Sequence, residues 1–141
     1  DLIDGDRWLN TKRGLFHVKA ADWQRSKAMD LMNNWIVSGK KIDAVAANAD
    51  EMAIGAAMAI RQAGMEPGKD ILVGGSDGGP AGLEAIKKDQ LAVTVYQDNK
   101  GQANGSIDLA LQMVRKEPYK AELTIPYQLI TKANYQDFVN P

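Results

Sequence analysis

The chain has 141 residues, 45% of them hydrophobic and 25% charged, which is the composition of one globular domain with a core of its own. Its 17 basic and 18 acidic residues nearly balance, and this balance, with no long basic run, argues against a nucleic-acid partner. The lack of cysteine excludes disulfides, thiol catalysis and cysteine-ligated metals, and no apolar run approaches the ~20 residues that span a bilayer.

The first half of the chain alternates between strand and helix patterns. Residues 15–20 (LFHVKA) alternate apolar and polar side chains, which predicts a strand. Asp22 is the predicted N-cap of the helix that follows, and Gly39 lies where that helix ends. The short apolar run 42–48 predicts a second strand, and residues 50–64 predict a helix that a glycine again terminates.

The same alternation continues to the carboxyl end. The predicted elements are a strand at 70–76, a helix at 79–90 with Pro80 in its first turn, a strand at 91–97, a helix at about 100–116, an extended tail at 121–130 and a short helix at 134–139. Nearly continuous apolar strands that alternate with helices indicate a parallel sheet covered on both faces. The predicted fold is therefore an α/β, doubly wound parallel sheet.

The turns after the predicted strands carry the candidate site. Open parallel sheets bind their ligands at the carboxyl ends of the strands, and here those turns offer carboxylate, amide, guanidinium and indole groups. A polyhydroxylated ligand needs this mixture, because each hydroxyl both donates and accepts hydrogen bonds. From spacing alone Asp77 fits a helix cap, a ligand anchor or a general base.

Other chemistries find little support. The glycines around Asp77 do not match a nucleotide-binding pattern. His17 is the single histidine, so a zinc site or a histidine-dependent triad is hard to assemble. Asp50 and Glu51 are interpreted as first-turn residues that the helix dipole favours. We therefore expect no cofactor, no metal and no catalytic residue.

Four segments together resemble the carboxyl-terminal part of periplasmic sugar-binding proteins, the ribose/galactose-type solute receptors of ATP-driven (ABC) importers. The similarity covers about residues 20–137 and is nearest to the inositol- and rhizopine-binding members. Such a resemblance implies two doubly wound lobes joined by three hinge strands, which close on a sugar without chemistry. The segments are ADWQRSKAMDLMNNWI, DAVAANADEMAIGAAMAIRQAG, ILVGGSDGGPAGLEAIKKDQLAVTVYQD and PYQLITKAN.

The resemblance also implies a set of ligand-binding residues. Asp77 matches the family aspartate that bonds sugar hydroxyls, and Gln97 matches a polar residue after the next strand. Trp23 matches the aromatic residue on the sugar face, with Arg25 in the same motif. The family has asparagine where this chain has Ala49, and Asn48 lies one residue earlier, where a side chain of a strand points to the other face.

The resemblance further predicts the domains, the function and the partners. We expect residues 21–141 to form the carboxyl-terminal sugar-binding lobe and residues 1–20 to be a partial or atypical start of it. The start DLIDGDRWLN lacks the apolar segment of a signal peptide, and the amino-terminal lobe is missing. The expected function is non-enzymatic binding of a monosaccharide or cyclitol by a periplasmic receptor.

The expected partners are the sugar or cyclitol, the membrane subunits of an ABC importer, and either the amino-terminal lobe or a second copy of the chain; no nucleic acid is expected. The alternative function is a small α/β hydrolase or sugar-modifying enzyme that uses Asp77 as a general base.

Overall fold

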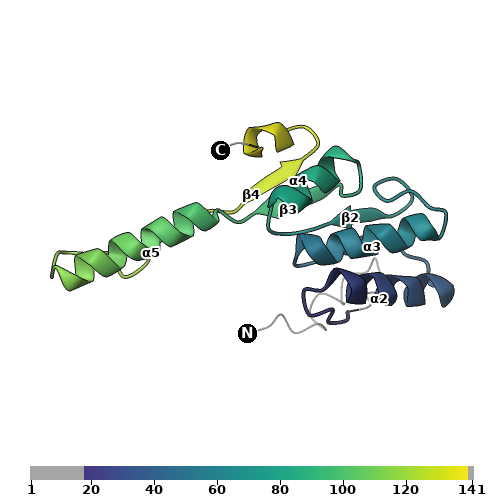
Figure 1. Cartoon of the computed structure of the whole chain (residues 1–141), viewed down its shortest axis with the longest axis horizontal. Helices are drawn as coiled ribbons and strands as arrows, with labels where there is room; N and C mark the ends of the chain where they lie inside the picture. Colours follow the sequence, from purple (N-terminus) through teal and green to yellow (C-terminus); the bar gives the residue numbers. More distant parts are fainter. Residues whose placement is uncertain (1–17, 140–141) are drawn as a thin grey trace, which may run out of the picture.

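A four-stranded sheet in the order β1-β2-β3-β4 organises the chain, and Figure 1 labels its strands β2, β3 and β4. The computed structural model describes residues 18–139. The three strands β1, β2 and β3 run parallel, and β4 pairs antiparallel with β3. The α/β class and the mostly parallel sheet are confirmed, while the strand in the predicted extended tail is a finding of the structure. The strand bounds are β1 Ala44–Ala46, β2 Leu72–Gly74, β3 Val93–Tyr96 and β4 Gln128–Thr131.

Helices connect the strands close to where the sequence predicts them. Gly39 and Gly64 follow two of them with φ angles of 73° and 79°, a left-handed conformation that glycine adopts without steric cost and that commonly ends a helix. Pro80 opens the third, where its missing N–H has no helical partner to lose. The helices are α2 Arg25–Val37, α3 Asp50–Gln62, α4 Pro80–Lys87, α5 Asn99–Val114 and the 3-10 helix η1 Tyr135–Phe138.

The core lies between one face of the sheet and the helices α3 and α4, with α2 packed beside α3. Val73 and Thr94 point into this core and are fully buried. Leu72 and Leu129 point to the opposite face and remain 51% and 61% exposed. In the described part of the chain, helices therefore cover one face of the sheet. The apolar strand patterns had predicted helices on both faces.

Helix α5 projects away from the sheet and its covering helices (Figure 1). It has no buried residue, although Ile107 and Val114 are exposed apolar side chains. Asp98 starts the helix by accepting a hydrogen bond from the Gly101 amide at 2.9 Å. A local cap thus begins α5, and the helix is covered only in part, by the segment that follows it, where Leu123 lies against Gly105. None of the described helices is long and apolar enough to cross a membrane.

Two local predictions near the start of the described region are wrong. Val18, Lys19 and Ala20 form no strand; Val18 is 73% exposed, so its alternation with polar neighbours buries no apolar face. The other residues of that predicted strand lie outside the described range. Asp22 is not the N-cap of α2, because Asp22 and Trp23 form a left-handed turn with φ angles of 49° and 55° before the helix begins.

Candidate functional site

Asp77 and Gln97 lie side by side because the pairing between β2 and β3 continues past the ends of both strands. The Asp77 amide donates to the carbonyl of Val95 at 2.9 Å, and the Gln97 amide donates to the carbonyl of Asp77 at 3.1 Å. The side-chain Nε2 of Gln97 also donates to the hydroxyl of Ser76 at 3.1 Å. The structure thus brings these two predicted residues together at the carboxyl ends of β2 and β3.

The Asp77 carboxylate is exposed and only half engaged. Its Oδ2 accepts a hydrogen bond from the Asp50 amide at 3.1 Å, which caps the first turn of α3. The helix-cap interpretation of Asp77 thus applies to α3, which precedes it, and not to α4, which follows it. Its Oδ1 has no hydrogen-bond partner among residues 18–139. Asp77 also has a φ angle of 130°, a costly conformation for a residue with a Cβ.

Asp50 is a buried residue of this region whose contacts the sequence did not predict. It is 3% exposed, its Oδ1 accepts from the Thr94 hydroxyl at 2.6 Å, and its Oδ2 accepts from the Gly78 amide at 2.9 Å. Burial raises the pKa of the Asp50 carboxyl above its ordinary value, against the lowering effect of those two hydrogen bonds. Thr94, a polar residue inside the apolar run AVTVY, was the one feature of the sequence that indicated a buried hydrogen-bond partner here.

Trp23 and Asn48 line a cavity of about 490 Å³ whose walls come from residues 18–23, α2, β1 and α3, and neither Asp77 nor Gln97 lines it. The Trp23 side chain is 70% exposed, and Asn48 is exposed beside it. Ala49 is 4% exposed and packs with Ala21 and Met52. The residue in the position of the family asparagine is therefore a small core residue, and the nearest amide lies one residue earlier, on the surface.

Arg25 forms a two-point ion pair with Glu51. Its Nε and Nη2 donate to the two carboxylate oxygens of Glu51, each at 2.9 Å. This pair joins the first turns of α2 and α3 and holds the end of the Trp23 turn against α3. Nη1 of Arg25 has no hydrogen-bond partner among the described residues, and the side chain is 44% exposed.

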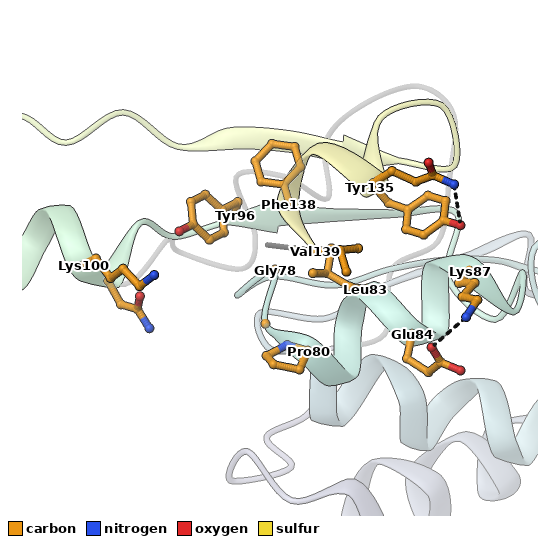
Figure 2. Close-up of a pocket in the computed structure, with 13 residues that line it drawn as sticks. Gly78, Pro80, Leu83, Glu84, Lys87, Tyr96, Lys100, Tyr135, Phe138 and Val139 are labelled. Atoms are coloured by element: carbon orange, nitrogen blue, oxygen red, sulfur yellow. Dashed lines mark hydrogen bonds and ion pairs between the residues drawn. The ribbon is translucent and has the colours of Figure 1, made fainter. Parts of the chain in front are cut away.

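A larger cavity of about 710 Å³ lies between α4 and η1 (Figure 2). Its walls are mostly apolar and aromatic, and the rings of Tyr96 and Phe138 meet there with centroids 5.3 Å apart. None of the five predicted ligand residues lines it. In the described range no group of three or more His, Cys, Asp or Glu side chains is placed to hold a metal ion.

Comparison with known proteins identifies the family. Residues 9–118 match the model of the periplasmic binding protein domain. The chain belongs to this family. A Rhizobium meliloti protein named for rhizopine binding is 43% identical over 120 residues, which are 85% of this chain and 38% of that protein. The ribose import binding protein of Salmonella typhimurium is 32% identical over 112 residues, 79% of this chain and 37% of that protein.

A solved structure gives the same family and fold. The solute-binding protein of an ABC transporter from Bacillus halodurans, determined with bound myo-inositol, superposes with a TM-score of 0.78 at 45% identity. The match covers 84% of this chain and 40% of that one. This chain therefore spans about two fifths of the length of the relatives that it matches. The resemblance read from the sequence is confirmed at the level of the family and the fold.

Proposed function

We propose that this chain is the carboxyl-terminal lobe of a periplasmic solute receptor that binds a monosaccharide or cyclitol for an ABC importer, without catalysing a reaction. The observation that carries the proposal is the Oδ1 of Asp77, which has no hydrogen-bond partner in the described part of the chain and lies beside Gln97 at the carboxyl ends of the strands, where open parallel folds bind ligands. The myo-inositol bound to the Bacillus halodurans relative makes a cyclitol the first ligand to test.

Each proposed contact residue has a group that is available to bind a ligand. Asp77 Oδ1 accepts from sugar hydroxyls, a type of hydrogen bond worth about 1.5–3 kcal/mol when one partner is charged. Gln97 donates to Ser76 through Nε2, so its Oε1 remains to accept from the ligand. Trp23 supplies an exposed indole for the apolar face of the ring. Arg25 Nη1 and the Asn48 amide are the remaining donors.

The shape of the chain supports a second lobe as a partner. Helix α5 projects from the sheet with exposed Ile107, Leu111 and Val114, and a helix with such a stripe normally buries it. We place α5, unlike the rest of the described chain, in the amino-terminal lobe of the complete receptor, so that the β3–α5 and α5–β4 connections cross between the lobes. This placement differs from the expectation that all of residues 21–141 form the carboxyl-terminal lobe. Closure then depends on contacts from both lobes, and membrane subunits of the importer recognise the closed form.

A binding experiment tests the proposal on the chain as it is. The ¹⁵N-labelled chain is titrated with myo-inositol, ribose, galactose and glucose, followed by amide shifts and by calorimetry. We expect one of them to shift the Gly78 and Gln97 amides and the Trp23 indole, with a dissociation constant weaker than about 1 µM because one lobe supplies half of the contacts. Binding at micromolar affinity or tighter would contradict the dependence on a second lobe.

Two variants and a control assign the contact. Asp77→Ala abolishes the shifts, whereas Asp77→Asn keeps an oxygen for the α3 cap and loses the charged acceptor, so it weakens binding by about tenfold. Asp30→Asn, an exposed change on α2, leaves binding unchanged. Equal binding by Asp77→Ala and the parent chain excludes Asp77 as a contact, and consumption of the sugar during the titration would instead indicate an enzyme.

A further inference from the structure

Asp50 connects three separate parts of the chain through one buried side chain. It begins α3, yet its carboxylate accepts hydrogen bonds from Gly78, in the loop after β2, and from Thr94, within β3. The Asp50 amide donates in turn to the Ser76 carbonyl at 2.7 Å and to Asp77 Oδ2 at 3.1 Å. The loop residues on both sides of Asp77 are thus bonded to Asp50.

The space around this carboxylate admits no larger group. A Cβ built on Gly75 or on Gly82 would collide with the Asp50 carboxylate. A Cβ on Gly78 would lie 2.7 Å from the Cα of Tyr96, a separation that carbon atoms do not tolerate. Glycine at positions 75 and 78 lets the loop lie directly on the carboxylate and on β3, and Gly82 lets α4 approach the same carboxylate. The fit is therefore specific to a side chain with the length of aspartate.

Asp77 needs an external restraint to keep its conformation. Its φ angle of 130° is unfavourable for a residue with a side chain, and its exposed carboxylate lies on a surface loop. Such conformations persist only where the surrounding structure enforces them. Two sets of contacts restrain this conformation: the backbone hydrogen bonds of Asp77 with Val95 and Gln97, and the bonds that join Asp50 to Ser76, Asp77 and Gly78.

We infer that Asp50 is the positioning residue of the ligand site: it holds the Ser76–Gly78 loop so that Asp77 Oδ1 faces the ligand beside Gln97. This inference rests on the proposed function, since it names the residue that orients the proposed ligand contact. Asp50 touches no ligand itself, because both of its oxygens are committed within the core. It acts through the Gly78 amide and through the cap that Asp77 forms on α3.

The first test measures the loop without any ligand. Amide hydrogen exchange and ¹H–¹⁵N shifts of Asp77 and Gly78 are recorded for the parent chain, Asp50→Ala, Asp50→Asn and Asp50→Glu. Loss of a bond to a charged acceptor accelerates exchange at Gly78 by about tenfold in Asp50→Ala, while the interior amides of α3 stay protected. Asp50→Asn fits the same space and keeps one acceptor oxygen, so it restores most of the protection.

The third variant, Asp50→Glu, separates the effect of side-chain length from the effect of the negative charge. Asp50→Glu keeps the charge but is too long for the space between Gly75 and Gly82, so it behaves like Asp50→Ala. If Asp50→Ala does not fold, Thr94→Val decides in its place, because it removes one partner of the carboxylate and loosens the Gly78 amide. Unchanged exchange at Gly78 in a folded Asp50→Ala or Thr94→Val chain overturns the inference, as does full protection in Asp50→Glu.

The second test adds myo-inositol to the same variants. We expect binding to weaken by about tenfold in Asp50→Ala and Asp50→Glu and to recover to within about threefold in Asp50→Asn, the range expected for one lost hydrogen bond. Asp30→Asn serves again as the control. A loosened loop with unchanged binding overturns the positioning role. If no sugar binds the parent chain, the proposed function fails, and the exchange measurements still decide whether Asp50 holds the loop.

Discussion

At the scale of single residues, the candidate site depends on the Asp50 carboxylate, whose burial costs free energy. Removing Asp50 from water disfavours its charged form, yet the chain surrounds it with Thr94, the Gly78 amide and two glycines. A buried charge of this kind contributes little to stability but selects one arrangement of its partners. Here the buried Asp50 carboxylate fixes the geometry of the loop that carries Asp77.

The contact between Asp50 and Gly82 makes a specific prediction about stability. Alanine normally stabilises a helix over glycine by about 0.5–1 kcal/mol, but Gly82→Ala in α4 places a methyl group against the Asp50 carboxylate. We therefore expect it to destabilise the chain by about 1–3 kcal/mol, as overpacking does. Urea unfolding measures the change.

A double-mutant cycle provides the control for that prediction. In the Asp50→Ala background the carboxylate is gone, so Gly82→Ala becomes neutral or stabilising. The same cost of Gly82→Ala in both backgrounds would show that the methyl group collides with something else. Gly79→Ala adds a methyl group where nothing lies within 4 Å, and we expect it to cost no more than about 1 kcal/mol, the price of a poorer helix cap.

The raised pKa of Asp50 predicts how stability depends on pH. Because the folded chain binds the Asp50 proton more tightly than the unfolded chain, the contribution of this group is largest below the ordinary pKa of 3.8. It declines as the pH rises through the raised folded pKa and is constant above it. Unfolding of the parent chain and of Asp50→Asn is measured from acid to neutral pH. The stability of the parent relative to Asp50→Asn falls over that window, and a rise would show that the folded pKa is lowered.

At the scale of elements, the helices differ in what supports them. Helix α3 is mostly buried between the sheet and its neighbouring helices, whereas α5 has no buried residue. An isolated helix of this length is marginal in water. The cap at Asp98 is therefore expected to contribute measurably to the stability of α5, beside the packing of Leu123 against Gly105.

Asp98→Ala tests this dependence on the cap. It removes the acceptor of the Gly101 amide and costs about 1 kcal/mol, which in a helix without a buried residue appears as local fraying. We expect faster hydrogen exchange through the first turns of α5 and lower helix content, with exchange in α3 unchanged. Asp108→Ala, within the same helix, is the matched control and raises helix content because alanine is the stronger helix former. Equal exchange in the Asp98→Ala and parent chains would show that something other than the cap supports α5.

At the scale of the whole molecule, the described residues leave apolar side chains exposed on the sheet and on α5. One face of the sheet exposes Leu72 and Leu129, and α5 exposes Ile107 and Leu111. Exposed apolar side chains that share a helix face, as Ile107 and Leu111 do, often mark an interface. In the complete receptor we assign the α5 surface to the amino-terminal lobe; in the lone chain a second copy is the available partner.

Sedimentation measures this directly. We expect the chain to self-associate with rising concentration and the double variant Ile107→Glu/Leu111→Glu to remain monomeric, since residues four apart share a helix face. Val37→Glu, at an 87% exposed position on α2, is the control and leaves association unchanged. A chain that stays monomeric at high concentration would show that the α5 stripe does not bind another copy.

Much of the fold and part of the candidate site followed from the sequence, because local patterns determine them. Apolar runs and terminating glycines place α2, α3, α4 and α5 close to their observed ends. The adjacency of Asp77 and Gln97 follows from parallel pairing, which brings successive strand ends to one edge. The left-handed turn at Asp22 and Trp23 was not predicted, because neither residue type favours a positive φ strongly enough to signal it.

The sequence by itself determined the alternation of strands and helices, the family, and the polar turns that the ligand site needs. The tertiary structure alone decided that Asp50 is buried beneath the loop, that β4 runs antiparallel to β3, and that α5 lies apart from the core. The physical reason is distance along the chain. Asp50 meets Gly78 across 28 residues and Thr94 across 44, and no periodicity within one segment encodes which distant groups close around a buried charge.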